Sequence, residues 1–202
     1  MTTVRQAELG EITGRSRNTI RDMQAQGRTP WNDVKFFDVT QRRFSTEEAL
    51  ALVLCEMLEN SGFVARDAAE AVLCQLKAVE LFLKDVEAGG DVAPRLVLAL
   101  RMPVEDSLTG FFWEGLCPGG EGTPEEIEGE IAGNIARIGT NKTRDEGQSR
   151  RRYIGGPHVG VASVGEAYRL LQYRAKRLGF TVAGKAIVKD SAGRRRSGSA
   201  PL

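Results

Sequence analysis

The stretch TGRSRNTIR at residues 13–21 decides the fold of the N-terminal part of the chain. Apolar residues at positions 4, 7, 9 and 12 predict a short helix before it, and Gly14 suits the left-handed residue that ends a helix. Ser16 is a good N-cap for a second helix over residues 17–26, which Gly27 ends. The sequence therefore predicts two short helices joined by a tight turn.

The second helix carries residue types that read DNA. Its Arg and Asn residues stand away from the predicted buried positions Ile20 and Met23. Arg hydrogen-bonds guanine bidentately and Asn hydrogen-bonds adenine when a helix enters the major groove. Two helices around a glycine-containing turn, the second rich in Arg and Asn, form the helix-turn-helix pattern of DNA-binding proteins. We therefore expect DNA contacts from Arg15, Ser16, Arg17, Asn18, Thr19 and Arg21.

A basic ribbon is predicted next. Residues 34–39 and 43–44 have strand-like sequence, and three bases lie on or beside them: Lys35, Arg42 and Arg43. A basic two-stranded ribbon beside a helix-turn-helix is a wing, which contacts DNA phosphates. The stretch STEE at residues 45–48 then forms a capping box, which begins a helix with apolar residues on one side and an end at Ser61-Gly62.

Three motifs in this order resemble the MerR family of transcription regulators. They are T-G-x-S-x-x-T-I-R at residues 13–21, RRFSTEE at 42–48, and S-G-F at 61–63, followed by Asp67 and Val72-Leu73. The resemblance covers residues 4–90 and implies a winged helix-turn-helix that binds and distorts promoter DNA. The chain departs from the family's pattern at Gly10, at Asp22-Met23 and at residues 27–31. These departures fit equally a phage excisionase or a phage terminase small subunit with a similar winged module.

A heptad seam predicts how the chain associates. Apolar residues from Ala65 to Val86 alternate by four and three, and a helix from Asp67 to Glu87 would be about 30 Å long. The resemblance implies that the corresponding helix forms an antiparallel coiled coil in a dimer. We expect that the seam forms a homodimer. The alternative is that it packs against this chain's own C-terminal domain. The contact residues would be Val72, Leu76, Val79, Leu83 and Val86.

Residues 91–190 predict a small α+β domain with a regulatory or oligomerisation role. Strand-like sequence occurs at 96–100, 108–116 and 180–188, and helices begin near Thr123 and at Ser163. The expected organisation is α+β: a winged helix-turn-helix at 1–66, a dimerisation helix at 67–90, this domain, and a disordered basic tail at 191–202. RNA polymerase or another protein is a candidate partner of the C-terminal domain.

Charge is distributed unevenly. Residues 1–46 hold eight basic and five acidic side chains, residues 47–135 hold five and eighteen, and residues 136–202 hold fifteen and four. Basic ends are suited to a polyanion such as double-stranded DNA. An additional DNA contact, or else a solvated loop, is predicted at Lys142, Arg144, Arg150, Arg151 and Arg152.

Composition excludes several classes of protein. The chain has 202 residues, three cysteines without paired spacing and one histidine, and we expect no metal, no cofactor and no enzymatic activity. It has neither an apolar run long enough for a membrane span nor a secretory signal, so we expect a cytoplasmic protein, nucleoid-associated when bound to DNA. The sequence predicts a dimeric, sequence-specific transcription regulator. The alternative is a phage DNA-packaging or recombination accessory protein that uses the same winged module.

Overall fold

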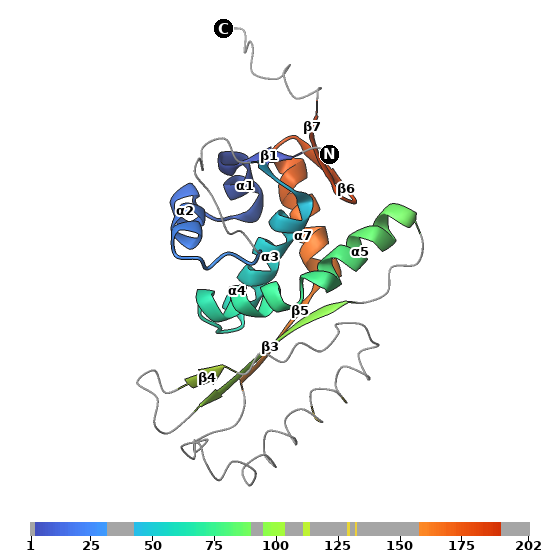
Figure 1. The fold of residues 1–202 in the computed structure, drawn as a ribbon. Helices are drawn as coiled ribbons and strands as arrows, with labels where there is room; N and C mark the ends of the chain where they lie inside the picture. Colours follow the sequence, from blue (N-terminus) through green and yellow to red (C-terminus); the bar gives the residue numbers. More distant parts are fainter. Residues whose placement is uncertain are drawn as a thin grey trace, which may run out of the picture.

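The computed structural model describes residues 3–31, 43–89, 95–103, 111–113 and 158–190, with two single helical residues, Gly129 and Ala132. It is an α+β fold of helices and small antiparallel sheets (Figure 1). In chain order the elements are β1 (Val4–Arg5), α1 (Gln6–Thr13), α2 (Arg17–Ala25), β2 (Arg43–Phe44), α3 (Thr46–Asn60), α4 (Ala65–Cys74), α5 (Leu76–Ala88), β3 (Leu96–Pro103), β4 (Phe111–Trp113), β5 (His158–Ser163), α7 (Val164–Arg177), β6 (Phe180–Ala183) and β7 (Ala186–Lys189). None of the described helices combines the length and apolar character that crossing a membrane requires.

Helix α3 is the centre of the body. The four consecutive residues Leu50, Ala51, Leu52 and Val53 are fully buried, although at about 100° per residue they point in different directions around the helix. A helix that is apolar on all sides must be covered on all sides, and α1, α4, α5, α7 and β5 pack around it (Figure 1). Its N-terminus is the predicted capping box, in which the Ser45 hydroxyl accepts from the Glu48 amide and the Glu48 carboxylate accepts from the Ser45 amide.

The prediction of one continuous dimerisation helix is wrong, because the structure has two helices, α4 and α5, in this region. The helix is interrupted at Gln75, between α4 and α5, where φ is −118° and ψ is 20°. Three seam residues, Val72, Val79 and Leu83, are fully buried in the core of a single chain, and Leu76 and Val86 pack partly buried against that core. The apolar seam therefore covers the chain's own core, which removes the need for a coiled-coil partner along it.

The C-terminal strands form two separate antiparallel sheets. β3 lies between β4 and β5, and the β3–β5 pair runs from the helical body outward to β4 (Figure 1). The strand predicted over 180–188 is instead a hairpin, because the chain reverses at Gly184-Lys185 between β6 and β7. Of the strand predicted at 108–116, β4 covers 111–113 and the rest lies outside the described residues, as does most of the helix predicted from Thr123.

One core joins the two halves of the chain. Its buried residues include Leu54 and Leu83 from the N-terminal half and Val97, Ala162 and Leu171 from the C-terminal half. The rings of Phe82 in α5 and Tyr168 in α7 meet edge to face, with centroids 5.4 Å apart. Residues on both sides of the predicted division between 67–90 and 91–190 therefore contribute to the same core.

Candidate nucleic-acid interface

The turn between α1 and α2 depends on glycine at two positions. Gly14 ends α1 with φ of 75°, as predicted, and its N–H donates to the Gly10 carbonyl. The Arg15 N–H donates to the same carbonyl at 2.9 Å. A Cβ atom on Gly10 would lie only 2.6 Å from the Arg15 carbonyl oxygen. Gly10, one of the departures from the MerR pattern, thus permits the close approach of this turn to α1.

Helix α2 begins where the sequence predicts. The Ser16 hydroxyl accepts from the Thr19 amide at 3.0 Å and also hydrogen-bonds the Thr19 hydroxyl at 2.8 Å. Ile20 and Met23 face inward and are buried. Arg17, Asn18 and Arg21 are consequently exposed along with the two capping residues. Five of the six expected DNA-contacting residues around this helix are therefore at the surface.

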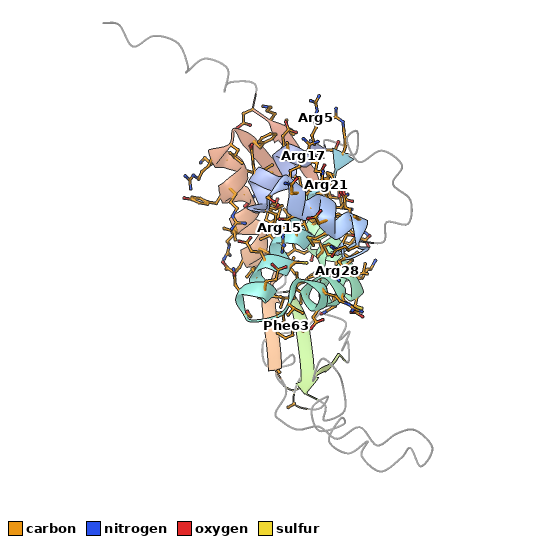
Figure 2. All side chains as sticks on the ribbon, turned by 90° about the vertical axis from the view of Figure 1, so that its left-hand side faces the viewer. Arg5, Arg15, Arg17, Arg21, Arg28 and Phe63 are labelled. Carbon is orange, nitrogen blue, oxygen red and sulfur yellow. The ribbon has the colours of Figure 1, made fainter. Side chains whose placement is uncertain are left out.

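Exposed arginines gather around α2, and we call them the α2 basic face. At about 100° per residue, Arg17 and Arg21 lie on one flank of α2, with Asp22 turned away from them, and Arg28 follows the end of the helix after Gly27. Figure 2 shows Arg5 beside this flank, on the face of the molecule turned toward the viewer. No carboxylate in the described part of the chain forms an ion pair with a member of the set, which comprises Arg5, Arg17, Arg21, Arg28 and Arg43.

The strand at 43–44 has a different described partner from the predicted one. It pairs antiparallel with β1, with Val4 opposite Phe44 and Arg5 opposite Arg43. Val4 and Phe44 are buried, so their burial holds the two short strands together, while both arginines are exposed. The predicted first strand of the wing, with Lys35 and Arg42, lies outside the described residues. Val4 was also expected to start a helix, but α1 begins at Gln6.

Arg15 is not a surface residue, contrary to the prediction. Its side chain is 8% exposed, and its guanidinium donates to the Glu59 carboxylate of α3 at 2.7 Å. The guanidinium also lies against the sulfur of Met23. The residue therefore ties the turn and α2 to α3. No local signal marks this role, because Glu59 is 44 residues away in the sequence.

A C-terminal residue that sequence reasoning missed holds the end of α1. Arg174 of α7 donates to the Thr13 carbonyl at 2.9 Å and makes two hydrogen bonds, of 2.5 and 2.9 Å, to the Glu56 carboxylate. The hydrogen bond to Glu56 raises the pKa of Arg174 above its usual value. The guanidinium satisfies a carbonyl at the helix end, where backbone acceptors lack partners within the helix. Helix α7 thus positions the turn that leads into α2.

The structure does not place the predicted additional DNA contact. Lys142, Arg144, Arg150, Arg151 and Arg152 lie outside the described residues. Cys55 is buried, and burial raises the pKa of its thiol, so the thiol is neutral. Within the described ranges no three His, Cys, Asp or Glu side chains form a group that could hold a metal ion.

Comparison with known protein families finds no match for the chain, and neither does a search of curated proteins.

Proposed function

We propose that this chain binds double-stranded DNA as a helix-turn-helix protein, with α2 in the major groove, and acts as a sequence-specific transcription regulator. The observation that carries the proposal is the α2 basic face. It places several arginines around one exposed helix without a described carboxylate to neutralise them. Such a surface attracts the DNA backbone and supplies the residue type that reads guanine.

The distribution of ion pairs supports this assignment. Two carboxylates of the acidic middle segment pair with bases elsewhere in the chain, Glu59 with Arg15 and Glu56 with Arg174, and Asp85 pairs with Arg95 within the segment. The acidic segment is thus partly neutralised by these pairs, whereas no ion pair to the α2 basic face occurs among the described residues. An unneutralised basic surface raises the association rate and affinity for a polyanion.

Different residues of the face suit different parts of a duplex. Residues near the N-terminus of a recognition helix contact base edges, and Arg17 and Asn18 are exposed in the first turn of α2. Arg43 on β2 is suited to phosphate, together with the predicted wing bases Lys35 and Arg42. We therefore propose that Arg17 and Asn18 specify sequence and that Arg43 provides affinity.

The proposed regulator acts as a homodimer on a pseudo-palindromic site. Its C-terminal strands would contact RNA polymerase or another protein. The alternative is a phage DNA-packaging or recombination accessory protein with the same module. One observation favours this alternative: the seam expected to form a coiled-coil dimer is occupied by the chain's own core. A dimer would therefore need a surface other than Val72, Val79 and Leu83.

Selection of bound duplexes from a random pool, at about 150 mM salt to weaken non-specific attraction, tests the proposal. An inverted repeat protected by two chains supports the regulator. A ring or a filament of chains along DNA supports the packaging or architectural alternative. Recovery of no motif, with no binding to any duplex, refutes DNA binding.

Two variants test the proposed division of roles. Arg17→Ala should weaken binding to the selected site by about 1–3 kcal/mol while affinity for random DNA changes much less. Arg43→Ala should weaken binding to both duplexes to a similar extent. Equal losses on selected and random DNA for both variants would contradict base reading by Arg17.

A further inference from the structure

The exposed side of α7 concentrates basic residues around one aromatic ring. Arg169, Tyr173, Lys176 and Arg177 are all exposed and, at about 100° per residue, lie within an arc of about 100°. We call these four residues the α7 face. Glu166 lies at the N-terminal end of this face and pairs with Arg169. Lys176 and Arg177 form no ion pair with a carboxylate among the described residues.

The α7 face borders the turn that leads into α2. On one flank of α7, Arg174 donates to the Thr13 carbonyl at the end of α1. On the opposite flank, Gln172 donates to the Val182 carbonyl of β6. Arg177 follows Arg174 by three residues and therefore lies on the α1 side of the helix. Figures 1 and 2 show α7 packed beside α1, which precedes α2.

Tyr173 and Arg177 are held together at the surface. The guanidinium carbon of Arg177 lies 5.8 Å from the centroid of the Tyr173 ring, within the range of a cation–π contact. Tyr173 as a whole residue is 60% exposed. The helix dipole favours bases in the last turn of α7, but it gives no reason for an exposed aromatic ring among them. Restraining both side chains in advance lowers the entropy lost when they bind a ligand.

We infer that the α7 face is a second contact for the same DNA duplex, bound to the phosphate backbone beside the groove that α2 enters. The first helix of a helix-turn-helix crosses the backbone, so a helix packed against α1 lies near the flanking phosphates. Arg, Lys and Tyr side chains are donors that proteins use for phosphate oxygens. The inference rests on the proposed function and adds to it a contact that increases affinity without reading sequence.

The double variant Lys176→Ala/Arg177→Ala tests the inference against a control of equal charge change. The control, Lys77→Ala/Lys84→Ala, removes two exposed bases from α5. The measurement is the slope of log Kd against log salt on a selected duplex with flanking DNA. The α7 variant should reduce the slope by about 2, since each phosphate contact contributes about 0.9, and the control should leave it unchanged. On a duplex without the flanking DNA, the wild type and the α7 variant should have the same slope of log Kd against log salt.

Three outcomes separate this inference from the proposal beneath it. A reduced slope with an unchanged sequence preference supports the α7 contact. A slope equal to that of wild type overturns it, and the proposed function still stands if Arg17→Ala weakens binding. Failure of the wild-type chain to bind any duplex overturns both. Circular dichroism spectra and cooperative thermal unfolding like those of wild type establish that the surface substitutions leave the fold of both variants intact.

Discussion

Arg15 and Arg17 lie two residues apart in the same turn, yet the fold gives them opposite environments. The side chain of Arg15 is 8% exposed and paired with Glu59, whereas Arg17 is exposed and belongs to the α2 basic face. Arg174 resembles Arg15 in this respect, because Glu56 and the Thr13 carbonyl take up its hydrogen bonds. The comparison teaches that the fold, and not the residue type, decides which arginine of the turn is paired with a carboxylate among the described residues.

The same contrast holds for apolar residues. The periodicity of Val72, Val79 and Leu83 is what a dimer seam requires, but the structure places all three in the core of one chain. Burial of apolar side chains is favourable whichever chain provides the contacts, so the periodicity alone does not predict whether the seam packs against its own chain or against a second copy.

The substitution with the largest expected effect tests whether the seam is core. Leu83→Ala removes a fully buried side chain and should lower the free energy of unfolding by about 3 kcal/mol. The loss should be the same at every protein concentration in thermal denaturation followed by circular dichroism. A melting temperature of the wild type that rises with concentration and loses that dependence in Leu83→Ala would place this residue in a dimer interface.

A smaller loss is expected at the turn before α2. Gly10→Ala adds a Cβ 2.6 Å from the Arg15 carbonyl oxygen, and the strain should cost about 2 kcal/mol. Gly165→Ala in α7 is the matched control, because its Cβ would lie 3.7 Å from the nearest described atom, on the Phe82 ring. The control should leave stability unchanged or raise it by up to about 1 kcal/mol. Equal unfolding midpoints of the two variants would show that the turn relaxes without cost.

The arginine comparison itself is tested by one matched pair of variants. Arg15→Ala should lower stability by about 1–2 kcal/mol, because the partly buried Glu59 loses its partner. Arg17→Ala should leave stability unchanged, because the Arg17 side chain is exposed. Urea denaturation of both variants gives the two values. Equal stability losses would mean that the two arginines do not differ in the way the structure indicates.

The smallest effect is expected on the surface of α5. Hydrogen bonds from Lys84 and Lys77 lower the pKa of Glu80 from 4.5 to about 2. A carboxylate with a lowered pKa stabilises the fold above pH 4.5, and this contribution is lost as the pH falls toward 2. Glu80→Gln should therefore lower the melting temperature slightly at pH 7 and leave it equal to that of wild type below pH 2. A difference that persists at the lowest pH would point to a cause other than this charge.

Features that depend on near neighbours in the chain were predicted well. The helix starts at Ser16, Ser45 and Ser163 and the left-handed Gly14 all occur where the sequence indicates them. Each involves atoms no more than five residues apart, so local sequence is sufficient. The exposure of Arg17, Asn18 and Arg21 follows from the inward direction of Ile20 and Met23 in the same helix.

The tertiary structure decided the features that join distant segments. Glu59 is 44 residues from Arg15, and Thr13 is 161 residues from Arg174. Nothing in a local pattern predicts such contacts, because they depend on how α3 and α7 pack against the first helices. The sequence by itself therefore determined where α2, α3 and α7 begin, where α1 ends and which residues turn outward on α2. Only the tertiary structure decided which of the described arginines are paired with a carboxylate, because ion pairing requires proximity in space and not along the chain.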